Sequence, residues 1–181
     1  MRALNLLKEA ASLYGSEIPP YKAYIWKMDF KSGAEWMRGC LVQIRMKEIV
    51  TENVYGFNAA GITKYGLAVL SSATVVFFSI VTRSLWLLWL APIAFYLVEV
   101  QMVFLFPLLI DGERNPFKRS RLLIRLQGGT SKAMGVVLPI AWVMMFGGLF
   151  GQGFIRSWCI GCLAILLLYE KTSKFVEEQP S

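Results

Sequence analysis

Two cysteines near the C-terminus have the residue type and the spacing that thiol chemistry needs. Cys159 and Cys162 form a CxxC motif in the stretch SWCIGCLAILLLYE. On a helix this spacing brings two thiols within one turn, and a helix N-terminus favours a thiolate, the nucleophile of disulfide exchange. We therefore treat Cys159 and Cys162 as candidate catalytic residues. The alternative is that both pack as small apolar residues, as free cysteines commonly do.

The stretch around this motif resembles the fourth helix of the vitamin K epoxide reductase family. That resemblance implies a membrane protein of four helices whose CxxC passes electrons to a quinone. The sequence departs from the family pattern in the first outer connection, residues 82–84, which holds no cysteine of the relay pair. The third cysteine, Cys40, is expected on the opposite side of the membrane from the motif.

Glu99 is an acidic residue inside a long apolar segment, with Gln101 close to it in sequence. Ionisable groups are costly in hydrocarbon and often functional there. Lys64 or a backbone carbonyl is a candidate partner, and without one Glu99 is expected to be protonated. A proton or ion site, a polar contact with another subunit and a neutral hydrogen bond between helices all remain possible interpretations.

Metal chemistry has little support in the sequence. There is no histidine, which excludes His-based metal sites, His general bases and His-ligated haem. Asp111 and Glu113 beside a basic stretch have the chemistry to hold Mg²⁺ and a phosphate. However, Asp111-Gly112 and Asn115-Pro116 are ordinary turn signals, and we favour a turn. No metal site is predicted, and the cofactor is unknown.

The composition indicates an all-α integral membrane protein. Of the 181 residues 56% are hydrophobic and 17% are charged, which is more apolar than a soluble domain. We expect a basic interfacial segment over 1–57, a bundle of four transmembrane helices over 58–172 and a short tail over 173–181. The spans are predicted at 58–81, 85–110, 134–150 and 154–172, the last being the weakest, with a re-entrant segment as its rival. Pro92 and Pro107 offer places for the long second span to kink.

The basic residues alternate along the chain as an even number of crossings requires. The first outer connection carries only Arg83 and the third connection only Arg156. The segment before Tyr65, the second connection and the tail carry the rest: Arg2, Lys8, Lys22, Lys27, Lys31, Arg38, Arg45, Lys47 and Lys64; Arg114, Lys118, Arg119, Arg121, Arg125 and Lys132; Lys171 and Lys174. Both termini and the loop 111–133 are therefore predicted to be cytoplasmic, in an inner (plasma) membrane.

Three amphipathic segments lie outside the predicted spans, near residues 4–14, 32–45 and 118–126. In the last, Leu122, Leu123 and Leu126 are expected to oppose the basic side chains. Helices of this kind lie in the headgroup layer, or they pack together as a small cap. The net charge of +7 sits beside apolar spans, so anionic lipid is a better partner than nucleic acid. The expected headgroup contacts are Lys118, Arg119, Arg121 and Arg125.

Gly147 and Gly151 form a GxxxG pattern near the end of the third predicted span. Small residues at this spacing allow two helices to approach closely. We expect a tight hairpin between the third and fourth spans. The same surface could equally seat a neighbouring protein or a flat pigment or quinone.

Three functions are compatible with these features. The first is a non-catalytic accessory or scaffold component of a membrane assembly, held by lipid and by other membrane protein subunits. The second is a thiol–quinone oxidoreductase that uses Cys159 and Cys162. The third is a small transporter or channel that uses Glu99. Whether the protein is an enzyme is not decided by the sequence.

Overall fold

The computed structural model describes residues 2–16, 30–46, 56–151 and 153–177, and every element in these ranges is helical. An all-α fold is thus confirmed. Parts of the expected interfacial segment and of the C-terminal tail fall outside the described residues. The elements are α1 (Ala3–Ser16), α2 (Phe30–Arg45), α3 (Phe57–Val81), η3 (Leu85–Trp89), α4 (Leu90–Gln101), α5 (Leu105–Ile110), α6 (Pro116–Leu126), α7 (Gly129–Phe146), η4 (Gly147–Phe150) and α8 (Phe154–Glu177).

Three helical segments are long and apolar enough to cross a membrane: Phe57–Val81, Leu85–Ile110 and Gly129–Leu149. They coincide with the first three predicted spans. The fourth, α8, carries Arg156, Glu170 and Lys171 within the length that a crossing needs. The structure therefore agrees with a membrane protein that has at least these three candidate spans.

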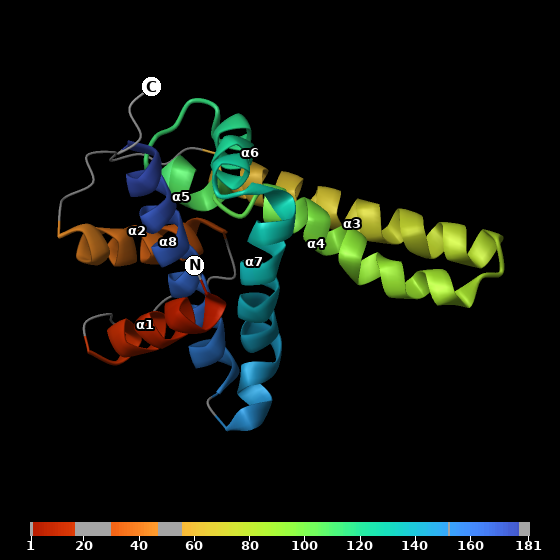
Figure 1. The fold of residues 1–181 in the computed structure, drawn as a ribbon, viewed down its shortest axis with the longest axis horizontal. Coiled ribbons are helices and arrows are strands. Elements are labelled where there is room, and N and C mark those ends of the chain that lie inside the picture. The colour runs from red at the N-terminus through yellow and green to blue at the C-terminus, as the bar shows by residue number, and fades with distance from the viewer. Residues whose placement is uncertain (1, 17–29, 47–55, 152, 178–181) are drawn as a thin grey trace.

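The first two candidate spans form a helical hairpin that projects from the rest of the molecule (Figure 1). α3 packs along α4 for most of its length, and the chain reverses at residues 82–84. Both prolines mark breaks, as expected. Pro92 lies in the first turn of α4, after the 3-10 helix η3, and α4 ends at Gln101, shortly before Pro107 in α5.

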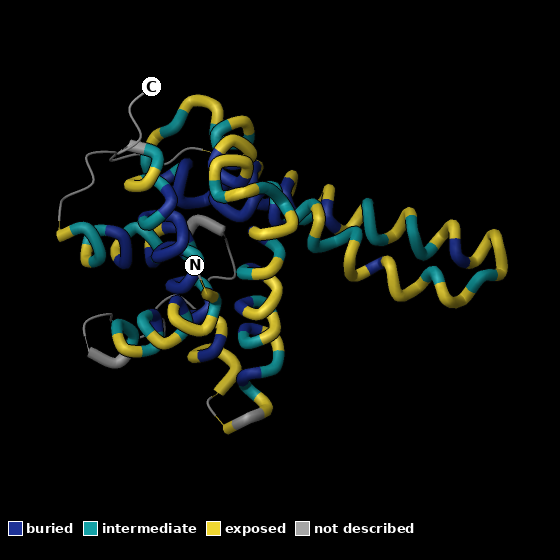
Figure 2. Tube along the Cα trace, in the orientation of Figure 1, coloured by how far each residue is buried: buried dark blue, intermediate teal, exposed yellow. Residues whose placement is uncertain are grey.

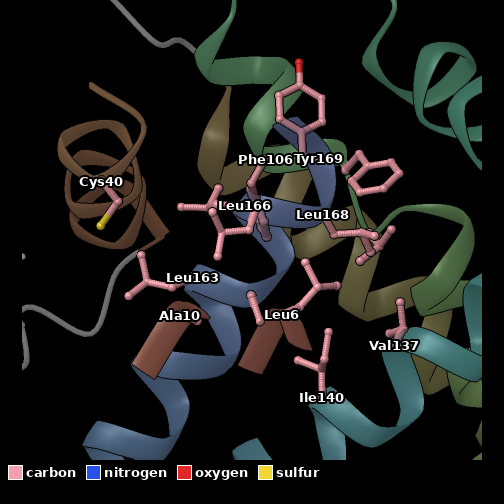
Figure 3. Close-up of a cluster of buried hydrophobic side chains, with 14 of the residues drawn as sticks. Leu6, Ala10, Cys40, Phe106, Val137, Ile140, Leu163, Leu166, Leu168 and Tyr169 are labelled. Atoms are coloured by element: carbon pink, nitrogen blue, oxygen red, sulfur yellow. The ribbon is translucent and has the colours of Figure 1, made fainter. Parts of the chain in front are cut away.

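The remaining helices form a compact body around α8 (Figure 1). α1, α2, α6 and α7 all pack against α8. Its side chains from Leu163 to Tyr169, except Ile165, are buried, and Figure 3 shows them among residues of α1, α2 and α7. The structure thus differs from the expected four-helix bundle. The hairpin extends away from α7 and α8 and contacts the body mainly where α4 meets α7, while α1 and α2 pack on α8 (Figure 1).

A tight turn joins α7 to α8, and glycines make it possible. A Cβ atom added to Gly147 would lie 2.6 Å from Ser157 Oγ, and one added to Gly161 would collide with Met144. Gly151 contributes differently, since it has a φ of +81° in the turn and no atom near its Cβ direction. The expected close hairpin is present, with Gly147 and Gly161 at the helix contact.

Candidate functional site

An intramembrane ion pair lies at the base of the projecting hairpin. Lys64 Nζ of α3 is 2.7 Å from Glu99 Oε1 of α4, and the Lys64 side chain is only 4% exposed. The ammonium also lies 5.2 Å from the ring centroids of Tyr65 and Phe106, within the range of a cation–π contact. Lys64 is therefore the partner of Glu99, as the sequence suggested. The second carboxylate oxygen, Oε2, is buried and has no hydrogen-bond partner among the described residues.

A cavity of 920 Å³ lies in the corner between the hairpin and the body. The ion pair is part of its wall. α2, α3, α4, α5, α7 and α8 all contribute to the lining, which is mainly apolar and aromatic. Cavities of this size hold one drug-sized or lipid-sized molecule. No local pattern predicted this site, because its walls come from segments that are distant along the chain.

Gln101, the other predicted intramembrane polar residue, does not join the ion pair. The side-chain amide of Gln101 donates to Thr130 Oγ1 at 2.6 Å. The backbone carbonyl of Gln101 accepts a hydrogen bond from Ser120 Oγ at 2.9 Å. These two contacts tie the end of α4 to α6 and to the start of α7. Gln101 thus has a positioning role at the junction of the hairpin and the body.

The two cysteines of the CxxC motif do not lie at the start of a helix. They are the sixth and ninth residues of α8, which begins at Phe154, so the N-terminal stabilisation of a thiolate does not reach them. Cys159 is buried and Cys162 is half-buried, and both are free thiols. Cys162 lines the cavity. The surroundings are apolar, whereas reactive cysteines usually sit in exposed, electropositive places.

Cys40 lies close to the CxxC motif, which corrects the expected position on the opposite side of the membrane. α2 packs on α8, and Cys40, which Figure 3 labels, belongs to the same buried cluster as Cys159, with Cys162 packed against that cluster. Burial, together with the neighbouring Cys162 and Cys159, raises the pKa of the Cys40 thiol well above its usual range. The three cysteines of the chain therefore converge on one region, although Cys40 stays protonated at neutral pH.

The N-terminal helix also contacts the motif. Tyr14 lies next to Cys159, and burial raises the pKa of the Tyr14 hydroxyl above its ordinary value. An ion pair between Glu9 and Lys171 joins the same two helices further along α8. α1 packs mainly against α8 and α7, so the alternative in which the three amphipathic helices pack on one another as a cap does not describe α1.

A second ionic cluster holds α2 to the body. Arg45 donates to both carboxylate oxygens of Asp111, at 2.6 and 2.8 Å, and its Nε donates to Glu170 at 2.6 Å. The Tyr169 hydroxyl completes the cluster with a bond of 2.6 Å to Asp111. Hydrogen bonding to Asp111 raises the pKa of Arg45, which stays charged. Asp111 caps α5 before a turn at Gly112, so the turn interpretation agrees with the structure, and its carboxylate is held by Arg45.

The basic helix α6 has a different buried face from the one expected. Ser120, Leu123 and Ile124 are buried, whereas Leu122 and Leu126 are exposed. These two leucines share the exposed surface with Lys118, Arg121 and Arg125, and Arg119 is half-buried. A surface that alternates leucine with arginine and lysine is typical of helices that lie in a headgroup layer.

Comparison of the chain with protein-family models, with curated proteins and with solved structures gives no match. Among the described residues no group of three or more cysteine or carboxylate side chains is placed to hold a metal ion. The function therefore has to be argued from the geometry.

Proposed function

We propose that this protein is a non-catalytic accessory component of a membrane assembly. The observation that carries the proposal is the projecting hairpin of α3 and α4. α3 packs mainly on α4, and the contacts of these two helices with the body are fewer. Exposed residues recur along the hairpin (Figure 2), and the exposed apolar side chains include Phe77 and Phe78 of α3 and Trp86 and Trp89 of η3.

A hairpin of this kind presents two helix surfaces that the protein itself leaves free. Helices in a membrane associate through close packing of their surfaces. The body contacts the hairpin mainly where α4 meets α7, and it leaves large apolar side chains of α3 and α4 exposed. The free surfaces suit the transmembrane helices of another subunit, while α6 supplies contacts to anionic headgroups.

Site-specific photo-crosslinking tests this function. A photoreactive amino acid at Phe77, on the hairpin, should yield a discrete protein adduct in native membranes. The same residue at Trp142, on the exposed side of α7, is the matched control on a candidate span of the body. A yield of lipid adducts alone from both positions, together with purification as a lone monomer in mild detergent, would contradict the accessory role.

The proposed topology has four crossings, with both termini cytoplasmic in an inner membrane. The support is the charge pattern, which leaves Arg83 and Arg156 as the basic residues of the two outer connections. Single cysteines at Arg83 and at Leu149, near the tips of the two hairpins, should react with an impermeant maleimide added to intact cells. A cysteine at Lys118 should react only after the cells are opened. If Leu149→Cys fails to react from outside, α7 and α8 re-enter instead of crossing.

Thiol–quinone oxidoreduction is the second candidate, and the convergence of Cys40, Cys159 and Cys162 favours it. In the reaction two thiols would form a disulfide, and their two electrons and two protons would reduce a quinone to the quinol. Alkylation with a maleimide of high mass before and after reduction would reveal a disulfide as a gel shift. Cys159→Ser and Cys162→Ser should then abolish the shift. If the three thiols stay reduced in cells and these substitutions leave growth unchanged, this candidate fails.

The transport alternative receives less support from the geometry. A proton or ion site needs a carboxylate that is free to change its charge. Glu99 already has its counter-ion in Lys64 at 2.7 Å. The pairing is better explained as the contact that holds α3 and α4 together at the base of the hairpin.

A further inference from the structure

The cavity between the hairpin and the body has two kinds of wall. One part is apolar and aromatic, with Phe95, Phe106, Phe154 and Trp158 among its residues. The other part is the Lys64–Glu99 ion pair. A ligand that fits both parts is an amphiphile, with a hydrocarbon portion and one polar end.

The 920 Å³ space is open to the surroundings along part of its wall, so a ligand can enter it from outside the protein. Water is a poor occupant of an apolar chamber, since each molecule needs two to four polar partners. The lining instead offers aromatic rings and the flexible side chains of Met144 and Met145, which adapt to irregular hydrocarbon. The cavity therefore suits a hydrocarbon chain.

The ion pair sets the chemistry of the polar end. Lys64 has its partners already in Glu99 Oε1 and two aromatic rings. Glu99 Oε2 is the group that still needs a hydrogen-bond donor, and it is enclosed by protein as the carboxylate now lies. The last torsion of a glutamate is soft, so a small rotation can turn this oxygen toward the cavity that Glu99 lines.

The charge balance decides between possible donors. Lys64 and Glu99 together are neutral, and a cationic head would bring an unpaired charge into a medium of low dielectric. An anionic head would bring an acceptor to an oxygen that needs a donor. A neutral hydroxyl group meets both requirements.

We propose that this cavity binds a neutral amphiphile whose hydroxyl group donates to Glu99 and whose hydrocarbon chain lies among the aromatic residues. A long-chain acyl alcohol and an isoprenoid alcohol share this chemistry. The hydroxyl recognises the ion pair, and the chain occupies the corner between α4, α7 and α8.

Photoaffinity labelling of the full-length protein in phosphatidylcholine liposomes tests the site. The probes are a C16 alcohol with a mid-chain diazirine, its methyl ether, the corresponding C16 carboxylic acid and a diazirine-bearing farnesol. Intact-mass spectrometry gives the labelled fraction, and peptide mapping gives the position. We expect the alcohol to label cavity residues at least fivefold more than its ether or the acid.

Two matched substitutions separate the cavity from the lipid-facing surface. Ala141→Trp fills the cavity and should lower labelling at least fivefold, with Ala91→Trp as a second blocking variant if the first fails to fold. Ala73→Trp adds the same side chain to an exposed position of α3 outside the lining and should leave labelling unchanged. Glu99→Gln should reduce the preference for alcohol over ether to about one, because the amide presents a donor of its own.

The comparison of the two alcohols identifies the source of the ligand. Stronger labelling by the C16 alcohol points to an acyl lipid, and stronger labelling by the farnesol probe points to an isoprenoid. Equal labelling by alcohol and ether in the unmodified protein would overturn the proposal. Preference for the carboxylic acid, or equal effects of Ala141→Trp and Ala73→Trp, would overturn it as well.

Discussion

The hairpin of α3 and α4 and the body around α8 both contain many apolar residues, but they place them differently. In the hairpin, side chains such as Leu70 and Phe77 are exposed on the outer surface of α3, which packs mainly on α4. In the body, Leu163 and Leu166 of α8 are fully enclosed by protein (Figures 2 and 3). The hairpin therefore depends on surroundings outside the chain, either lipid or another subunit, whereas α8 depends on the chain itself.

A leucine removed from each region measures this difference directly. Leu163→Ala deletes a side chain that is 0% exposed, and we expect the free energy of unfolding to fall by about 3–5 kcal/mol. Leu70→Ala deletes one that is 62% exposed, and the expected change is below about 0.5 kcal/mol. Reversible unfolding in mixed micelles, followed by circular dichroism, gives both values. Similar losses at the two positions would mean that the hairpin is as enclosed as the body.

Substitutions at Lys64 and Glu99 test whether the stability of the hairpin also depends on the ion pair between its two helices. Lys64→Met leaves Glu99 as an unpaired acid in an apolar place, and we expect a loss of about 3 kcal/mol. The double variant Lys64→Met, Glu99→Leu should recover most of that loss, because it removes both buried charges. The same unfolding measurement applies. A double variant that is no more stable than Lys64→Met would show that the pair itself, and not the orphaned charge, stabilises the hairpin.

Hydropathy predicted the hairpin better than it predicted the body. It located the three span-capable segments, the breaks near Pro92 and Pro107 and the pairing of Glu99 with Lys64. It could not distinguish a helix that faces lipid from one that faces protein, since both are apolar. For that reason the packing of α8 against α1 and α2 was missed, while the assignment of α8 as a fourth crossing stays a prediction.

The long-range contacts of the body had no signal in the sequence. Arg45 bonds to Asp111 and to Glu170, which lie 66 and 125 residues further along the chain, and no local pattern links the three residues. Cys40 was assigned to the wrong side for the same reason, because its position depends on how α2 packs. On α6 the buried face lies around Ser120 and Ile124 instead of Leu122 and Leu126, about 100° further around the helix. The contacts of α6 with α5, α7 and α8 select that face, and periodicity alone does not show them.

The Arg45 cluster is the contact that attaches α2 to the body, so its loss should affect the body and spare the hairpin. Arg45→Ala leaves two carboxylates without their donor, and we expect a loss of about 2 kcal/mol in unfolding free energy. Arg45→Lys keeps the charge but loses the bidentate geometry, so its unfolding free energy should lie between those of the unmodified protein and of Arg45→Ala. Arg121→Ala, an exposed position on α6, is the control. Proteolysis within α2 should become faster in Arg45→Ala, and an unchanged rate would argue that α2 is held by its apolar contacts alone.

The exposed surface of α6 should show the smallest effect, because its contacts are at the edge of the membrane. Replacing Lys118, Arg121 and Arg125 by glutamine should reduce the stabilisation that anionic lipid provides, by about 1 kcal/mol for each residue. The measurement is the rise in Tm between nanodiscs of phosphatidylcholine and nanodiscs that also contain phosphatidylglycerol, at low and at high salt. Replacing Leu122 and Leu126 by glutamine instead should weaken the response to both lipids equally, since it removes apolar contact and leaves the charge. If the charge variant and the leucine variant respond alike, and salt has no influence, α6 contacts protein and not headgroups.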